Sequence, residues 1–381
     1  MLLFPAVLLL VQHEFGLGYA GLGILASVNF LCYGLGALPA GMLADRFGGE
    51  RVLAIWLFGS SIACVAIGVS VGPRSLGLAL ALLGLSASLH HPAGSGVLVA
   101  LRPRLGAKVA RAFGLSGILG NVGLAVAPIL GSFVGVNWGW RAAFFLGALP
   151  GLALSRPLWR QPREDPATRS AASQHPSLRN ALGLPLILLF ALETLMGFVL
   201  QGFSTFLPAY LAGQAGVAAI TAAQVKRGGA FASLALLFGG LGHLAAGRLM
   251  GAGHRETVFL AAVTTSTVGL FGMGITEGIP LVLFSILLSF AFFGLGTVSN
   301  TFVALHTPPH LGGTVFGVTF TLAFGFGSLA SSTMGVVGEH FGLPAVFVGL
   351  GLVSAVGVGL VACFGSVTNG WAGFRSRRPV A

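Results

Sequence analysis

One acidic residue lies deep inside a long apolar stretch of the sequence. Glu193 stands about eleven residues into the apolar run Leu182–Leu211, and a charged side chain near the middle of a bilayer costs roughly 3 kcal/mol. A carboxyl group at such a position can take up and release a proton, or can pair with a cationic substrate. We therefore interpret Glu193 as a proton-coupling residue. The alternative is a protonated or hydrogen-bonded residue that only packs.

Other polar side chains interrupt further apolar runs. The pair His90 and His91 is followed by Pro92, which loosens a helix. Adjacent histidines point about 100° apart on a helix, so the two cannot easily hold one metal ion, and we expect no metal and no cofactor. The candidates for contact with a substrate are His90, His91, Gln201, Thr205 and Asn300. The alternative for each is hydrogen bonding between packed helices.

The composition indicates which elements position these residues. Hydrophobic residues make up 55% of the 381 residues and charged residues only 8%, against about 25% charged residues in soluble proteins. Too few polar side chains are present to cover a water-facing surface, which excludes a soluble enzyme and a disordered protein. The sequence contains no Walker loop, catalytic triad or metal-spaced cluster. We predict a membrane protein that is not an enzyme.

The net charge of +11 does not indicate a nucleic-acid partner. Lysines and arginines occur in short clusters between apolar runs, which is typical of the loops of membrane proteins. A nucleic-acid surface needs a basic stripe instead. The partners that we expect are the lipid bilayer, a small-molecule substrate and protons, and we expect no nucleic acid.

Eleven apolar runs are long enough to cross about 30 Å of hydrocarbon, which takes about 20 residues. The run Met1–Val11 precedes them and spans only about 16 Å at 1.5 Å per residue. We expect about 15–20 further residues upstream of it; the alternative is a half-length or interfacial first helix. The eleven long runs are Tyr19–Leu43, Val52–Val71, Ser75–Ala100, Ala112–Val136, Arg141–Trp159, Leu182–Leu211, Gly229–Met250, Thr257–Ile275, Ile279–Leu305, Thr314–Val337 and Pro344–Phe364.

The placement of lysine and arginine predicts the orientation in the membrane. If the segment after Leu43 is cytoplasmic and the sides alternate, sixteen of the twenty basic residues lie inside, as the positive-inside rule favours. With twelve helices, both termini are then cytoplasmic. We expect a multi-pass protein of a bacterial inner membrane. The four basic residues outside are Arg74, Arg141, Lys226 and Arg227.

A polar segment divides the apolar runs six and six. It carries four prolines and five arginines, which is typical of a linker between helical bundles. Similar short segments recur 203–206 positions apart in the two halves, and such repeats are typical of transporters. We predict a bundle over residues 1–155, a central loop over 156–181, a second bundle over 182–365 and a basic tail over 366–381.

The segment GMLADRFGGER over residues 41–51 carries the most specific pattern. Its glycines permit close packing and a tight turn. Asp45 can cap a following helix or pair with an arginine across the loop. The residues of this pattern are Gly41, Asp45, Arg46, Gly48 and Arg51.

A second pattern combines small residues with a proline in the apolar run Ala112–Val136, which is the fifth run when the short run Met1–Val11 is counted as the first. Its spacing is G-x8-G-x3-A-P-x2-G, in which the small residues would allow close helix packing and the proline a bend. The alternative is ordinary packing glycine. The residues are Gly114, Gly123, Ala127, Pro128 and Gly131.

The first pattern, the helix count, the central loop, the repeat and the charge asymmetry together resemble the major facilitator superfamily (MFS). The resemblance implies an all-α membrane fold with twelve transmembrane helices in two pseudo-symmetric six-helix bundles, the first helix being truncated. It also implies that Asp45 and Arg46 are gating residues and that helices one, four, seven and ten line the cavity. The second copy of the pattern has Gly251 where the first has Asp45, which weakens any latch there.

The second pattern resembles the fifth-helix motif of MFS drug/proton antiporters, with Ala127 in place of a glycine. The histidine–proline pair, together with the segment Phe206–Leu211, is similar to the fosmidomycin-resistance branch. These resemblances imply a monomeric secondary transporter that moves a small organic molecule by alternating access, with proton-coupled efflux. The alternatives are an uptake symporter or facilitator, and a non-transporting membrane sensor or scaffold.

Overall fold

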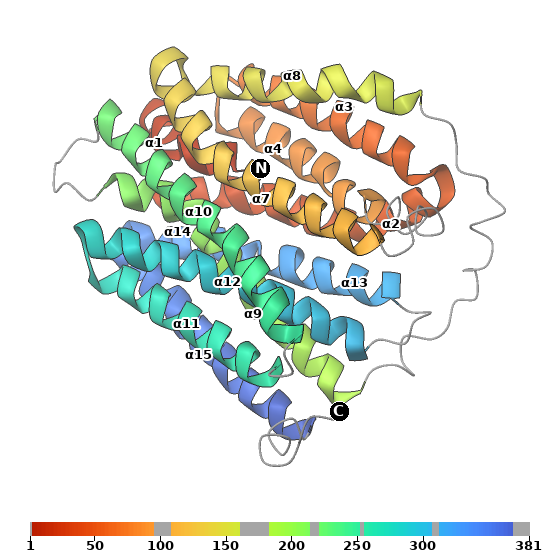
Figure 1. Cartoon of the computed structure of the whole chain (residues 1–381). Coiled ribbons are helices and arrows are strands. Elements are labelled where there is room, and N and C mark those ends of the chain that lie inside the picture. The colour runs from red at the N-terminus through yellow and green to blue at the C-terminus, as the bar shows by residue number, and fades with distance from the viewer. Residues whose placement is uncertain are drawn as a thin grey trace.

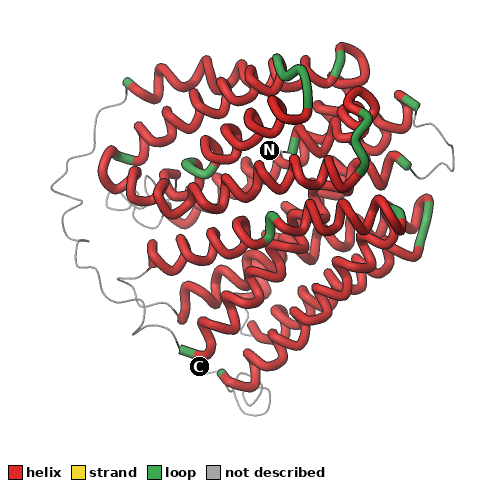
Figure 2. Tube along the Cα trace, turned by 180° about the vertical axis from the view of Figure 1, so that it is seen from behind, coloured by secondary structure: helices red, strands yellow, loops and turns green. Residues whose placement is uncertain are grey.

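A computed structural model describes residues 2–94, 108–160, 183–213, 221–251, 255–306 and 312–368. All regular structure in these ranges is helical, and Figure 2 shows no strand among them. Eleven of the described helices are long and apolar enough to cross a membrane. The predicted all-α fold with eleven long spans is therefore confirmed. The short first run forms α1, Leu3–Phe15.

Consecutive helices before the central segment alternate in direction along the chain (Figure 1). Their bounds are α2 Tyr19–Phe47, α3 Gly49–Gly68, α4 Pro73–Ala87, α7 Lys108–Trp138 and α8 Trp140–Trp159. The helices after it have the bounds α9 Leu184–Ala212, α10 Ala222–Gly251, α11 Arg255–Ile275, α12 Gly278–His306, α13 Gly312–Phe320, α14 Leu329–Phe341 and α15 Leu343–Val367. Figure 1 shows α1 to α8 above α9 to α15, with α10 beside α7 at the boundary. We call the end where α8 stops and α9 starts the linker end, and the other the opposite end.

The fourth span is broken where one uninterrupted run was predicted. Helix α4 ends at Ala87, a turn follows at residues 88–89, and helical structure resumes at residues 90–94. The cause is Pro92, because it has no N–H to donate to the carbonyl of Ser88 and its ring crowds that carbonyl. The break lies next to His90 and His91.

The eleventh span is also irregular. Between α13 and α14 the chain forms a π-helix, Thr321–Phe326 (η5), a feature that is frequent at functional sites. Glycines of two neighbouring helices allow close approach to it: a Cβ on Gly34 of α2 would lie 2.6 Å from the Cα of Gly325, and a Cβ on Gly197 of α9 would lie 2.6 Å from the Cα of Ala323. Helices α2 and α9 therefore both cross the eleventh span at the π-helix.

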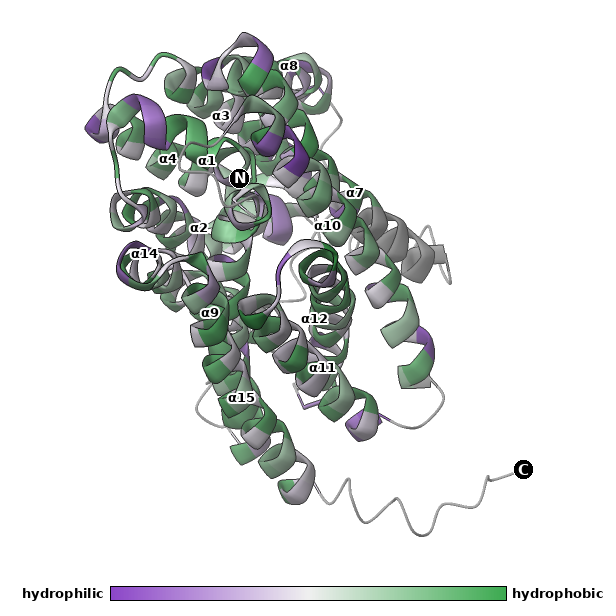
Figure 3. Ribbon diagram, turned by 90° about the vertical axis from the view of Figure 1, so that its left-hand side faces the viewer, coloured by the Kyte–Doolittle hydropathy of each residue, from purple (hydrophilic) through white to green (hydrophobic). Residues whose placement is uncertain are grey.

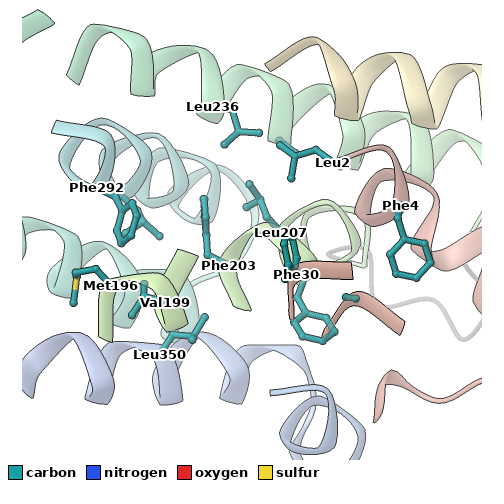
Figure 4. Close-up of a cluster of buried hydrophobic side chains, with 14 of the residues drawn as sticks. Leu2, Phe4, Phe30, Met196, Val199, Phe203, Leu207, Leu236, Phe292 and Leu350 are labelled. Carbon is teal, nitrogen blue, oxygen red and sulfur yellow. The ribbon is translucent and has the colours of Figure 1, made fainter. Parts of the chain in front are cut away.

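The apolar core extends through both groups of helices. Leu2, Phe4 and Phe30 from the first group belong to the same buried cluster as Leu207 and Leu236 from the second, and Figure 4 shows their side chains together. Figure 3 shows apolar residues along the helix surfaces and hydrophilic residues at many helix ends. Such a distribution fits a protein that is surrounded by lipid.

Candidate functional site

The loop pattern of residues 41–51 forms a single-residue connection. Helix α2 ends at Phe47 and α3 begins at Gly49, so Gly48 alone joins them with a φ of 93°, which favours glycine. A Cβ on Gly41 would lie 4.0 Å from the Cβ of Pro92. The guanidinium of Arg51 lies 5.6 Å from the centre of the Trp159 ring. The side chains of Asp45 and Arg46 lie outside the described residues, so their gating role stays a prediction.

The small residues of α7 have different environments. A Cβ on Gly131 would lie 2.8 Å from the Cβ of Ala6 in α1, whereas no described residue has an atom within 4 Å of a Cβ on Gly123. Pro128 is buried, and its carbonyl would be 2.6 Å from a Cβ on Gly229 of α10. Ala127 is half-buried. The surroundings of Gly114 lie outside the described residues.

The proton-coupling candidate lies between two helices of the second group. Glu193 of α9 is half-buried, and the hydroxyl of Ser299 in α12 donates a hydrogen bond to its Oε1. The one ion pair in the described part of the chain joins Arg141 to Glu14 instead, with Nη2 and Oε1 2.7 Å apart. The carboxyl group of Glu193 therefore accepts a hydrogen bond from a neutral hydroxyl group. It can bind a proton or a cation without the loss of an ion pair.

Two of the predicted contact residues contribute to helix packing. Thr205 is fully buried, its hydroxyl lies 2.8 Å from the hydroxyl of Ser331 in α14, and it donates to the carbonyl of Gln201 at 2.7 Å. Gln201 is buried, and its Nε2 has no hydrogen-bond partner in the part of the chain that the structure describes. The structure places Thr205 between α9 and α14, away from any open surface. Contact of either residue with a substrate stays a prediction.

The two histidines join a row of aromatic rings. The His90 ring stacks on Trp56 of α3 with the centroids 4.2 Å apart, and its centroid lies 5.0 Å from that of His91. The exposed His91 ring is parallel to the Phe320 ring of α13, with the centroids 5.6 Å apart. Tyr33 of α2 contacts His91 edge to face and Phe324 of η5 at 4.6 Å. The rings therefore bridge the two groups of helices.

Asn300 is exposed on α12. One turn before it, Thr297 pairs with His243, and the sequence pattern singled out neither residue. His243 of α10 lies with its Nδ1 2.7 Å from the hydroxyl of Thr297. His243 shares a helix face with Gly240, whose Cβ would lie 3.0 Å from the amide nitrogen of Asn121 in α7. The His243 ring also lies edge to face against Phe293, with the centroids 5.6 Å apart, so His243 packs against α12 within the second group. The sequence signal available was a single histidine in an apolar run, which does not reveal its partner.

The groups of helices meet along α2 and the eleventh span. The hydroxyl of Ser27 donates to the carbonyl of Ser328 at 2.5 Å and accepts from the N–H of Ser332 at 3.0 Å. A Cβ on Gly23 would lie 3.1 Å from the Cα of Ser332. Small residues and hydroxyl groups therefore join the helices at close range, as in other membrane helix pairs.

A second contact between the groups joins α7 to α10. The amide of Asn121 donates to the carbonyl of Leu236 at 3.1 Å, and the N–H of Ile129, next to Pro128, donates to the hydroxyl of Ser233 at 2.8 Å. Because a proline disturbs the helix hydrogen bonds around it, the backbone amide is free to bond across the boundary. Pro128 thus lies directly beside a backbone hydrogen bond that joins α7 to α10.

Charged groups hold the opposite end together. Oε2 of Glu339, at the end of α14, accepts from the N–H of Ala20 at 2.9 Å. Ala20 lies in the first turn of α2, where N–H groups lack helix partners and attract anions. A Cβ on Gly18 would lie 2.6 Å from the carboxyl carbon of Glu339, so a larger residue there would displace the carboxylate from this position. At the same end, Lys226 Nζ of α10 donates to Oδ1 of Asn137 in α7 at 2.8 Å.

No group of three or more histidine, cysteine or acidic side chains with metal-binding geometry occurs among the described residues. The arrangement is that of a helical membrane protein in which two groups of helices meet along packed faces. Polar side chains lie inside it at intermediate depth. Proteins that move solutes across membranes are built in this way.

Residues 1–332 match the Major Facilitator Superfamily, and the chain belongs to that family. It is therefore a multi-pass membrane protein of a transporter family. The predicted resemblance is confirmed at this level. The finer branches, drug/proton antiporter and fosmidomycin resistance, stay predictions.

Two curated relatives match about two fifths of the chain. The tetracenomycin C resistance and export protein of Streptomyces glaucescens is 28% identical over 144 residues, which are 38% of this chain and 26% of that protein. The gallate transporter of Pseudomonas putida is 27% identical over 149 residues, which are 39% of this chain and 33% of that protein. The matched segments thus span only a quarter to a third of these relatives.

Solved structures share the fold over the whole chain. A bacterial homologue of the human lysosomal transporter Spinster, in an inward-facing and occupied conformation, has a TM-score of 0.79 at 16% identity, covering 96% of this chain and 92% of that chain. The nucleoside transporter NupG (D323A mutant) has a TM-score of 0.74 at 16% identity, covering 95% and 96%. At this identity the likeness concerns the fold alone.

The two glycines of α7 provide a matched pair for a stability measurement. Gly131→Ala places a methyl group against Ala6, so α1 must shift, and we expect a loss of about 1–3 kcal/mol of stability. Gly123→Ala meets open space and removes a flexible residue from a helix, so stability is unchanged or rises by up to about 1 kcal/mol. Thermal unfolding of both variants in detergent checks this. Equal melting temperatures would contradict the packing role of Gly131.

The contact of Glu339 with α2 can be tested by a distance measurement. Glu339→Ala removes an anion from a helix N-terminus, worth about 0.3–1 kcal/mol, so the open state at the opposite end should gain up to about fivefold in population. Spin labels at the exposed Val71 and Ile275, in a background without native cysteines, report the separation of the groups. His340→Ala, on the neighbouring residue, is the control. Identical distance distributions in both variants would exclude this role for Glu339.

Proposed function

We propose that the chain is a secondary active transporter that moves a small organic molecule across the membrane by alternating access, with proton-coupled efflux. Two groups of helices that meet along small-residue faces can rock against each other with little loss of packing. Two polar contacts cross between the groups at the opposite end, namely Glu339 with Ala20 and Lys226 with Asn137. Such contacts can be broken and remade during transport.

The observation that carries the proposal is the position of Glu193. It is the tenth residue of the 29-residue α9, and its carboxylate is bonded to a serine of α12 without a cationic partner among the described residues. A carboxyl group at this depth is costly unless it has a function. In the proposed cycle Glu193 alternates between a proton and the substrate.

Two observations support export as the direction of transport: the described functions of two relatives, and the pattern of small residues around Pro128. The Streptomyces glaucescens relative is a resistance and export protein, and a second relative, from Streptomyces alboniger, is a puromycin resistance protein. The small-residue pattern around Pro128 resembles that of drug/proton antiporters. The gallate transporter of Pseudomonas putida supports the alternative of uptake by a symporter or facilitator.

The proposed orientation places the linker end in the cytoplasm. Arg51, Arg156, Arg248 and Arg255 all lie at that end of their helices, in agreement with the positive-inside rule. Both termini are then cytoplasmic, in a bacterial inner membrane, and the protein acts as a monomer. We propose that the first bundle ends at residue 155 and that the second begins at residue 182. Most of the central loop between them lies outside the described residues.

Everted membrane vesicles with a pH-sensitive dye test the coupling. With the vesicles energised, a transported compound should partly collapse the pH gradient in the wild type. Glu193→Gln should abolish that signal, because the amide cannot take up a proton at physiological pH. The same variant should still exchange labelled substrate for unlabelled substrate without a gradient. Ser299→Ala keeps the carboxylate and should retain the dye signal at reduced amplitude.

The control variant for this experiment is Glu277→Gln, which changes an exposed acid in the turn between α11 and α12. It should behave as the wild type. Proton movement that survives in Glu193→Gln would disprove the carrier role. Counterflow without any dye response in the wild type would favour a facilitator, and absence of both would favour a sensor or scaffold.

A further inference from the structure

We propose that the rings of Tyr33, His91, Phe320 and Phe324, together with Glu193, form a binding site for a flat aromatic cation. This proposal rests on the proposed function, because it names the substrate class of that transporter. We call the four rings the aromatic belt. Three helical segments of different groups contribute to it: α2, the segment after α4, and the eleventh span.

The aromatic belt differs from the rest of the boundary between the groups. Elsewhere α2 and the eleventh span approach through Gly23, Ser27 and their partners, which leave no space between the helices. In the aromatic belt, large rings take over, and His91 remains exposed although its face is parallel to Phe320 within 1°. An aromatic residue with exposed surface can stack on another flat ring system.

The irregular backbone on both sides presents these rings. His91 follows the break that Pro92 causes in the fourth span, and Phe324 lies in the π-helix of the eleventh span. Breaks and π-helices re-aim side chains away from the regular helix register. Among the described residues, the buried Nδ1 of the neighbouring His90 also has no hydrogen-bond partner, so a polar atom beside the belt can still accept or donate a hydrogen bond.

Glu193 lies at the level of the aromatic belt. Gly197 of α9 packs on Ala323 of η5. Glu193 is four residues before Gly197 and Phe320 is three residues before Ala323, and both helices start at the linker end. At 1.5 Å per residue, Glu193 and Phe320 lie about 6 Å and about 4.5 Å from that crossing along their helices, both toward the linker end.

The charges at this depth decide the sign of the ligand. Every lysine and arginine in a described helix lies within six residues of a helix end, and every acid except Glu193 lies within three. The described residues therefore supply one carboxylate and no permanent cation at the level of the belt. A cation is attracted there, whereas an anion lacks a counter-charge and meets Glu193. Rings also attract cations to their faces.

Equilibrium binding of four probes to the purified full chain in detergent tests the substrate class. The probes are 9-aminoacridine (a flat cation), acridone (flat and neutral), acridine-9-carboxylate (a flat anion) and adamantylammonium (a cation that is not flat). We expect 9-aminoacridine to bind about tenfold tighter than acridone or adamantylammonium, and acridine-9-carboxylate to show no saturable binding. Micelles without protein correct for partitioning of the probes.

Variants separate the two components of the site. His91→Leu and Phe320→Leu should each weaken both flat neutral and flat cationic probes about threefold to tenfold, and leave adamantylammonium unchanged. His91→Phe should restore binding. Glu193→Gln should weaken the two cations and leave acridone unchanged. Trp138→Leu, which removes an exposed ring at the opposite end, is the matched control and should bind every probe as the wild type does.

Three results would overturn the proposal: equal affinity for acridine-9-carboxylate and 9-aminoacridine, unchanged binding in both leucine variants, or no saturable binding of 9-aminoacridine to monodisperse wild-type protein. Binding at equilibrium needs no gradient, so the result is independent of proton coupling. The predicted probe order without proton movement in vesicles would leave the site in place and refute the coupling. Proton coupling to other compounds without the probe order would refute the site alone.

Discussion

Close approach of helices through small residues is the constraint on which the rest of the structure depends. Lipid is as apolar as leucine, so membrane helices gain little from hydrophobic burial and must gain contact area instead. At the crossing of Gly34 with Gly325 and of Gly197 with Ala323, backbones touch where side chains would keep them apart. These crossings join α2, α9 and the π-helix, and thereby set the distance between the two groups of helices.

Polar side chains are distributed unequally around that crossing. Toward the opposite end, hydroxyl groups and the Glu339 carboxylate bond directly from one group to the other. Toward the linker end, aromatic rings meet across the boundary, and Glu193 bonds within its own group. Contacts of the first kind are broken at modest cost in a polar environment, whereas rings can slide over one another. The two groups of helices thus meet through hydrogen bonds that can be broken at the opposite end, and through aromatic rings that can shift relative to each other toward the linker end.

The candidate site could be predicted from the sequence only in part. Glu193 stands out because a carboxylate in an apolar run is rare, and it lies inside a helix as predicted. Its partner Ser299 could not be identified, because serine is common in membrane helices and gives no signal of its own. Thr205 is a polar residue in an apolar run, as a cavity residue would be, yet its hydroxyl group lies within hydrogen-bond distance of that of Ser331 between two packed helices. Gly123 and Gly131 belong to one motif and have opposite environments.

The sequence by itself determined the fold class, the eleven long spans and the short α1, because the length of an apolar run and the bilayer thickness decide which segments cross. It also determined the family, which the loop pattern and the repeat indicated. Only the tertiary structure decided which polar groups meet. It showed that Pro92 breaks the fourth span beside His91, that a π-helix divides the eleventh, and that rings from three segments converge. The physical reason is that run length is a local property of the chain, whereas the direction of a side chain depends on helix rotation and on packing against helices distant in the sequence.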